Sequence, residues 1–188
     1  MLSFLRIFAT YSKNIMVRSF PISIAASLIA LLTCLQATAQ NYRTNLAGGT
    51  GDWNDVSSWQ VESPNGSNNW IASATFPTSV RNNITVRSGD HIVVTANLTV
   101  DQLEIEENGI VTVDPAVNFT VANGPGVDIT VFNSGGSFGF LNINGRFLLN
   151  NGATHSGLSA ANCTFSAGSF YRHLFNQTEG VVPVASWD

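Results

Sequence analysis

The sequence predicts an all-β fold, built as a short single-stranded parallel β-helix of stacked coils. Three segments share the order Asn, apolar, Thr, apolar, and they begin at Asn97, Asn118 and Asn162. A related segment, 140–143, lies between the second and the third, so that the four starting points are 21, 22 and 22 residues apart. A repeat of this length, made of β-type residues, is typical of a solenoid with about 21–22 residues per coil.

The individual strands follow from the alternation of apolar and polar residues that begins near residue 83. Alternation with period two indicates strands that are buried on one side. Asn-Gly and Gly-Gly pairs separate the strands, because both residues tolerate the left-handed backbone that a sharp corner needs. The expected strands are 84–87, 91–95, 98–106, 110–113, 119–122, 128–133, 138–143, 146–150, 162–166 and 169–173.

The same alternation predicts which side chains point into the coils. One interior row is expected to contain Leu98 and Val100, Phe119 and Val121, Leu141 and Ile143, then Cys163 and Phe165. A second row is expected to contain Val111 and Val113, Ile129 and Val131, Phe147 and Leu149, then Phe170. Equivalent side chains would stack about 4.8 Å apart, and the burial of each contributes about 1.5–3 kcal/mol.

The first forty residues are predicted to be a secretory signal peptide. Residues 1–21 carry three basic residues and no acid, the apolar run 22–32 follows, and a small-x-small site ends at Ala39. The run is too short to cross a bilayer core of about 30 Å. We therefore expect a Sec-type signal that is cleaved after Ala39 or Gln40, which leaves a secreted or cell-surface protein without a membrane span.

Two alternatives remain open within this leader. Met16 would give a signal of more ordinary length, so the true start could lie there. Cys34 follows an apolar run, as a lipidated cysteine does, although Thr33 suits lipidation poorly. We favour ordinary cleavage, because the Ala-x-Ala site lies just beyond Cys34.

The charge of the mature chain limits its partners. Downstream of the leader, five arginines oppose twelve acidic residues and no lysine occurs, which gives a net charge of −7. Nucleic acids and anionic membranes both need a basic footprint, so neither is expected as a partner. Cys163 is the one cysteine left after cleavage, so stability must come from burial and backbone pairing rather than from an internal disulfide.

Residues 41–80 are predicted to form a Trp-rich cap over the first coil. Trp53, Trp59 and Trp70 lie there among short polar turns. A solenoid needs such a cap, because its first coil would otherwise expose apolar side chains and an open strand edge. The alternative is a stacking platform for sugar rings, with Trp59 and Trp70 as the glycan contacts. We favour the plug.

Acidic residues supply the candidates for a metal site. Asp101, Glu104 and Glu106 lie close together, and carboxylate oxygens are the ligands that Ca²⁺ prefers. Polysaccharide lyases on parallel β-helices combine such clusters with a basic residue, but Arg146 and Arg172 lie two and three coils further on. A structural role or weak Ca²⁺ binding is therefore favoured over catalysis, and no other cofactor is expected.

The remaining polar candidates are interpreted as structural. His91, His155 and His173 are too scattered for convergent metal ligands. Thr99, Thr120 and Thr164 could form a water-ordering array, but Asn142 interrupts it and Thr is simply a good strand residue. Asn-x-Ser/Thr triplets could accept glycans, yet corner and strand chemistry also produces them; they begin at Asn65, Asn83, Asn97, Asn118, Asn162 and Asn176.

Residues 48–150 resemble a known kind of module. The pattern consists of Gly-Asp-Trp53-Asn-x3-Ser-Trp59, Trp70 and Pro77, then Asn83-Ile-Thr-Val86-x2-Gly89-x-His91-x-Val-Val-Thr95, then Leu103-x-Ile105-x3-Gly109-x-Val-Thr-Val113. It resembles the opening module of large secreted bacterial surface proteins, in which a Trp-containing cap leads into a G8-like right-handed β-helix. Many of these are type IX secretion cargo with a C-terminal sorting domain. The resemblance implies an extracellular adhesive or matrix protein, and it brings no catalytic residues.

The expected organisation is a signal peptide (1–40), the cap (41–80) and β-helix coils (81–188). Proteins of the resembled kind continue where this chain stops, so we expect it to be the N-terminal piece of a longer protein. The first functional hypothesis is a non-enzymatic surface module that is adhesive or structural and contacts extracellular glycans or cell-surface components. The second is a carbohydrate-active β-helix, either lyase-like or glycan-binding.

The inward phase of the strands can be tested at Val121. Val121→Asp would place a charge among apolar side chains, at a cost that a domain of ordinary stability cannot absorb. We expect the variant to lose its cooperative thermal transition, monitored by circular dichroism. A variant that still melts cooperatively would contradict the proposed phase.

Overall fold

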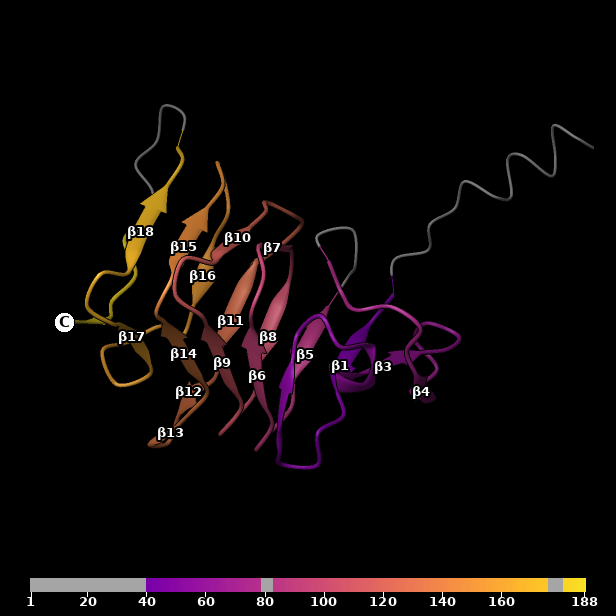
Figure 1. Ribbon diagram of the computed structural model, residues 1–188. Coiled ribbons are helices and arrows are strands. Elements are labelled where there is room, and N and C mark those ends of the chain that lie inside the picture. Colours follow the sequence, from indigo (N-terminus) through magenta and orange to yellow (C-terminus); the bar gives the residue numbers. More distant parts are fainter. Residues whose placement is uncertain (1–39, 79–82, 176–180) are drawn as a thin grey trace, which may run out of the picture. The chain divides into compact units, whose positions relative to one another are not determined.

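The computed structural model describes residues 40–78, 83–175 and 181–188 (Figure 1). The chain divides into two compact units, 1–38 and 39–188, and all that follows concerns the second. Apart from Gln40, the predicted signal peptide lies outside the described residues, and so do Arg81 and Asn176.

The described residues are mostly β-strands, which confirms the all-β class. One 3₁₀ helix, η1 (Val56–Ser58), interrupts the strands near the N-terminal end. We call the three main sheets A, B and C. In spatial order, sheet A contains β16 (His155–Ser156), β11 (Ile129–Val131), β8 (Leu103–Ile105), β5 (Ile84–Val86), β1 (Tyr42–Thr44), β3 (Trp59–Glu62) and β4 (Trp70–Ala72).

Sheets B and C are built in the same way. Sheet B contains β19 (Ser186–Trp187), β17 (Cys163–Phe165), β14 (Phe140–Ile143), β9 (Ile110–Val113), β6 (His91–Val94) and β2 (Thr50–Asp52). Sheet C contains β18 (Phe170–His173), β15 (Arg146–Leu149), β10 (Asn118–Val121) and β7 (Leu98–Val100). A separate small hairpin joins β12 (Asn133–Ser134) to β13 (Ser137–Phe138).

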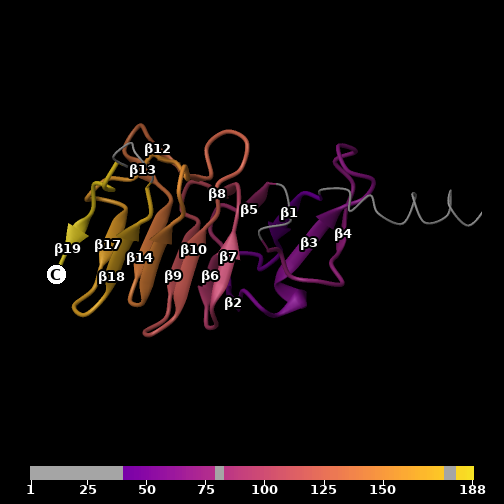
Figure 2. The ribbon, with the colours of Figure 1, turned by 90° about the horizontal axis from the view of Figure 1, so that it is seen from above.

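From β5 onward the chain visits sheets A, B and C in turn. For example, β5 lies in sheet A, β6 in sheet B and β7 in sheet C, and β8, β9 and β10 repeat that order. Pairing is parallel in sheets B and C, and it is antiparallel in sheet A only at β1–β3 and β3–β4. Within residues 40–188 the colours therefore advance along the sheets from indigo to yellow (Figure 2).

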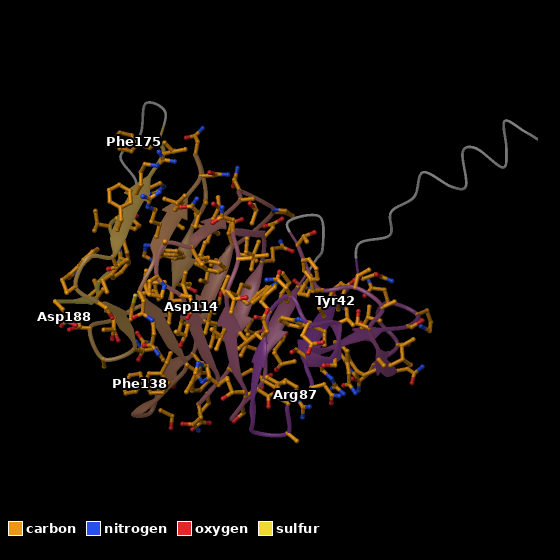
Figure 3. The ribbon with its side chains drawn as sticks, viewed as in Figure 1. Tyr42, Arg87, Asp114, Phe138, Phe175 and Asp188 are labelled. Atoms are coloured by element: carbon orange, nitrogen blue, oxygen red, sulfur yellow. The ribbon has the colours of Figure 1, made fainter. Side chains whose placement is uncertain are left out.

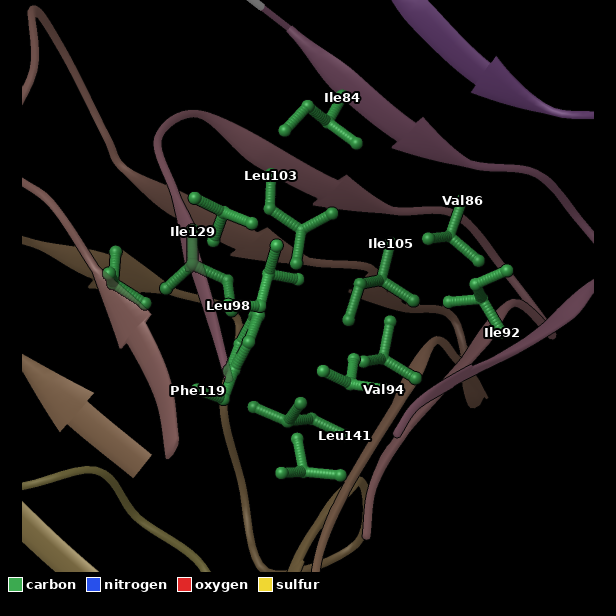
Figure 4. Packing of buried hydrophobic residues seen from close by; sticks show 14 of the residues in the cluster. Ile84, Val86, Ile92, Val94, Leu98, Leu103, Ile105, Phe119, Ile129 and Leu141 are labelled. Atoms are coloured by element: carbon green, nitrogen blue, oxygen red, sulfur yellow. The ribbon is translucent and has the colours of Figure 1, made fainter. Parts of the chain in front are cut away.

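Apolar side chains from all three sheets pack against one another. In β9, β10 and β14 the residues alternate between buried and half-buried, as a strand with one inward face requires. Figure 4 shows Ile105 of sheet A, Val94 of sheet B and Leu98 of sheet C directed into one common interior. The inward positions predicted from alternation are confirmed there, since Val121, Ile143 and Leu149 are all fully buried.

The predicted strand 98–106 is wrong. The structure divides it into β7 and β8, which belong to different sheets. Gln102 lies between them with φ of 53°, a left-handed conformation that turns the chain. The sequence concealed this corner, because neither Gly nor Asn marks it.

The predicted stacking rows must also be corrected. Phe119 pairs with Leu98 as expected, but its other partner is Phe147 rather than Leu141. Leu141 instead pairs with Val111 and Cys163 in sheet B. The two predicted rows therefore combine strands of different sheets, although their inward direction is correct.

The spacing of paired residues is less regular than 21–22. Leu98 and Phe119 are 21 residues apart and Leu141 and Cys163 are 22 apart, but Val111 and Leu141 are 30 apart. The extra length lies in the loop 122–128 and in the hairpin β12–β13. Both lie between sheets, so they lengthen a connection without disturbing the pairing.

Two further differences concern the ends of the sheets. Phe170 was expected to point inward, but it is 49% exposed and lies directly beside Arg146 on sheet C. Tyr171 takes the inward position and contacts the Phe147 ring at 6.0 Å. The short strands β2, β16 and β19, together with β1, β3 and β4, were not predicted as strands, since each is too short or irregular to show a clear period.

Aromatic rings link the N-terminal region to the interior. Trp53 packs edge-on against Trp59 at 4.8 Å and against Phe119 at 6.4 Å. Phe119 stacks on Phe147 at 5.9 Å. Trp53 and Trp59 are 0% and 1% exposed, and their indole N–H groups donate to the carbonyl oxygens of Pro77 and Trp53 at 3.0 and 2.8 Å. The burial therefore leaves neither N–H unsatisfied.

Phe147 tests the contribution of this aromatic packing. It is fully buried and contacts Phe119, Phe165 and Tyr171. We expect Phe147→Ala to lower the free energy of unfolding by about 3–5 kcal/mol, because it removes apolar contacts and leaves a cavity. Denaturant titration measures the loss. Thr120→Ala, at an outward position, should change stability by no more than about 0.5 kcal/mol, and an equal loss in both would contradict this packing.

Candidate functional site

The outer face of sheet C holds a pocket of about 530 Å³. Arg146, Leu148, Phe170 and Arg172 line it together with Asn118 and Ser169. Its volume lies within the range of about 300–1,000 Å³ that is usual for small-ligand sites. We call it the arginine pocket.

Backbone register brings these residues together. Arg146 of β15 pairs with Asn118 of β10 on one side and with Phe170 of β18 on the other. Arg172 pairs with Leu148, two residues further along. Since alternate residues share a face, all five side chains project to the outside while Phe147 and Leu149 fill the interior. A strand spacing of about 4.8 Å and a rise of about 3.3 Å per residue place the Cα atoms of Arg146 and Arg172 about 8 Å apart.

The pocket is positively charged in an acidic protein. No Asp or Glu is among its lining residues. Among the described residues, neither Arg146 nor Arg172 has a hydrogen bond or an ion pair. Both guanidinium groups are therefore free to donate to an external acceptor, and their planar forks match the geometry of carboxylate or sulfate oxygens.

Asn118 adds a further polar group to the pocket. Its backbone N–H donates to the side-chain oxygen of Asn97 at 2.8 Å. Its own Oδ1 atom is buried and has no hydrogen-bond partner within the described part of the chain. An unsatisfied buried acceptor raises the free energy of the folded state, so a donor that reaches this oxygen would be stabilised.

The sequence named these arginines but did not place them in a site. Arg146 and Arg172 are 26 residues apart, and in the notation of equal coils they would not have been aligned with Phe170 on the same face. The one usable signal was that two of the five arginines of the mature chain occupy outward positions near its end. The pairing of β15 with β18 was needed to bring them together.

Trp70, a predicted glycan contact, lies at the edge of sheet A. It is half-buried in β4, and the Arg43 guanidinium lies over its ring at 4.2 Å from the centroid. Arg43 also donates through Nε to Gln60 at 2.9 Å, and burial followed by the charge of Arg87 lowers its pKa. Trp59, the other predicted contact, is 1% exposed, so its ring faces lie in the interior.

The acidic candidates occupy separate positions along β8 and its flanking turns. Glu104 is exposed on the outer side of sheet A, and Glu106 accepts a hydrogen bond from the backbone of Ser88 at 2.8 Å. Within residues 40–78, 83–175 and 181–188, no group of three or more His, Cys, Asp or Glu residues could hold a metal ion. Ca²⁺ binding by Asp101, Glu104 and Glu106 thus stays a prediction without a shared cradle.

Asp101 instead belongs to a corner with Asp128. Asp128 is fully buried, and its carboxylate accepts hydrogen bonds from the backbone N–H of Gly124 at 2.6 Å and of Thr154 at 2.7 Å. A side chain at Gly124 would collide with the Asp101 carboxylate. Burial raises the pKa of Asp101, and the hydrogen bond to Asp128 and the negative charge of Asp128 raise it further.

The other polar candidates are engaged in the framework. Asn162 is 1% exposed; its Oδ1 accepts from the Ser159 backbone at 2.7 Å and its Nδ2 donates to Gly157 at 2.9 Å, so this sequon is a corner. Thr99 and Thr120 pair in sheet C, but Thr164 lies in sheet B, so the three do not form one array.

The histidines lie at separate positions as well. His91 contacts Thr112 at 2.9 Å, and His155 contacts the carbonyl of Val181 at 3.1 Å. Burial and the nearby His155 lower the pKa of His173. Burial alone raises the pKa of the Cys163 thiol to about 12, which leaves it protonated and unreactive at neutral pH.

No family model, curated protein or solved structure matches this chain. The G8-like resemblance therefore stays a prediction. Among the described residues, no helix has the length and apolar character that crossing a membrane requires.

The Asp101–Asp128 corner predicts a specific dependence of stability on pH. A raised pKa means that the folded state favours the protonated carboxyl, so ionisation of Asp101 destabilises the fold at neutral pH. This loss disappears as the pH falls through the folded pKa toward the unfolded value of about 3.9. We expect Asp101→Asn to melt at a higher temperature than the wild type at pH 7, with the difference shrinking toward pH 4.

Glu104→Gln is the matched control, because it removes the same charge from an exposed position of the adjacent strand. Thermal melts of the three proteins between pH 4 and pH 8 give the comparison. A difference between Asp101→Asn and the wild type that is independent of pH, or that has the opposite sign, would contradict the raised pKa.

Proposed function

We propose that the protein is a non-enzymatic extracellular or cell-surface module that adheres to glycans or cell-surface components, built as a short right-handed parallel β-helix. The observation that carries this proposal is the cyclic order of the strands, in which each sheet receives every third main strand from β5 to β18. Each cycle is one coil, and stacked coils give a rigid framework whose outer faces are continuous along the stack.

The handedness and the cap extend the same proposal. A connection between parallel strands of one sheet is right-handed in about 98% of cases, and every coil here is such a connection. The buried Trp53 and Trp59, with the antiparallel strands β3 and β4, would close the N-terminal end of the stack. These features agree with the module that the Trp and Gly pattern resembles.

Adhesion is favoured over catalysis by the separation of the charged groups. A lyase needs its acidic metal ligands and its base in one groove. Glu104 projects from sheet A, whereas Arg146 projects from sheet C. The lyase-like alternative would require these groups to meet, and the register holds them on different faces.

Glycan binding without cleavage is the second candidate within the same proposal. The arginine pocket favours it, because it combines donors, a buried acceptor and an exposed aromatic ring on a rigid sheet. Trp70 offers a second aromatic contact at the edge of sheet A.

A glycan array combined with a lyase absorbance assay tests the proposal. We expect the protein to be retained on a subset of glycans and to release no unsaturated product, with or without Ca²⁺. Turnover that is lost in Asp101→Asn, Glu104→Gln or Arg146→Gln would overturn the non-enzymatic assignment. The absence of retention on every glycan and on intact cells would overturn the adhesive assignment.

A further inference from the structure

We propose that the arginine pocket binds an acidic saccharide, with Arg146 and Arg172 holding its carboxylate or sulfate group. This inference rests on the proposed function and narrows it to one class of ligand and one site. Its elements are two unpaired guanidinium groups, one exposed phenyl ring and one unsatisfied amide oxygen, all on the outer face of sheet C.

Charge is the first argument. The mature chain has five arginines and no lysine against twelve acids, yet two of these arginines lie in one pocket that no carboxylate lines. Two like charges at about 8 Å repel each other. An anion between them removes this repulsion and accepts charge-assisted hydrogen bonds from both forks.

The preference for arginine is the second argument. Each guanidinium presents a planar fork that binds a carboxylate or sulfate group through two parallel hydrogen bonds. Arg146 and Arg172 project from neighbouring strands of a rigid parallel sheet, so their bases are fixed by backbone hydrogen bonds. The pocket therefore loses little conformational freedom when a ligand binds.

The neutral groups favour a saccharide over a simple ion. Phe170 is 49% exposed beside Arg146, and its ring offers a face for the apolar C–H side of a sugar. Ser169 and the Oδ1 atom of Asn118 are partners for sugar hydroxyl groups. A volume of about 530 Å³ exceeds what an inorganic ion fills and is suited to a sugar residue with its neighbours.

Isothermal titration of the whole protein tests the ligand class. The probes are an oligogalacturonate, a sulfated galactan oligosaccharide, the corresponding neutral oligosaccharide and inorganic sulfate. We expect both acidic oligosaccharides to bind more tightly than the neutral one, and to bind less tightly as salt is added. The tighter of the two acidic probes identifies whether a carboxylate or a sulfate is the natural group.

Substitutions locate the binding. Arg146→Gln and Arg172→Gln should each weaken the acidic probes by about tenfold, since each removes a charge-assisted hydrogen bond. Phe170→Ala should weaken the acidic and neutral oligosaccharides alike. Arg87→Gln is the matched control, because Arg87 lies outside the pocket at the turn between β5 and β6 (Figure 3) and loses the same charge. Thermal melts verify that all four variants are folded.

Several outcomes would overturn the inference. Equal affinity for neutral and acidic oligosaccharides would exclude charge recognition, and an equal loss in Arg87→Gln would show a non-local effect of net charge. Inorganic sulfate that binds as tightly as the sulfated oligosaccharide would show an ion site rather than a saccharide site. Retention on neutral glycans that the arginine variants leave unchanged would disprove this inference and leave the adhesive function intact. Pocket binding without retention on glycan surfaces or cells would do the reverse.

Discussion

Parallel backbone pairing between neighbouring strands of each sheet is the constraint on which the rest of the structure depends. Each strand has only two to four residues, too few to be stable alone. Pairing fixes the strands one spacing apart, and alternation then directs every second side chain inward. Val111, Leu141 and Cys163 consequently fall on successive strands of sheet B and bury one another.

Buried polar side chains keep this pairing in register at the corners. Asp90 accepts hydrogen bonds from the Thr44 hydroxyl at 2.6 Å and from the Gly48 backbone at 2.8 Å, which fastens the first loop to the turn before β6. Asp128 and Asn162 fasten later turns in the same manner. Because these groups are satisfied, their burial costs little, whereas the loss of a partner would leave an uncompensated charge or amide.

The same constraint separates the part of the sequence that builds the fold from the part that can recognise a partner. Inward positions are restricted to apolar residues of suitable size, and connections between sheets can lengthen without disturbing the pairing. Outward positions are free to vary, so the chemistry of an outer face is the chemistry of its outward residues. On sheet C these include Asn118, Arg146, Phe170 and Arg172, which makes that face cationic on an otherwise acidic chain.

The sequence by itself determined the all-β class and the inward phase of most strands, because both depend on alternation within a few neighbouring residues. It placed Phe147 and Val121 inside without any knowledge of their partners. Only the tertiary structure decided which strands pair, since register depends on the unequal lengths of distant turns, such as the loop 122–128. The arginine pocket depends on that register: Arg146 and Arg172 become neighbours through the pairing of β15 with β18, across a distance in sequence that no local pattern spans.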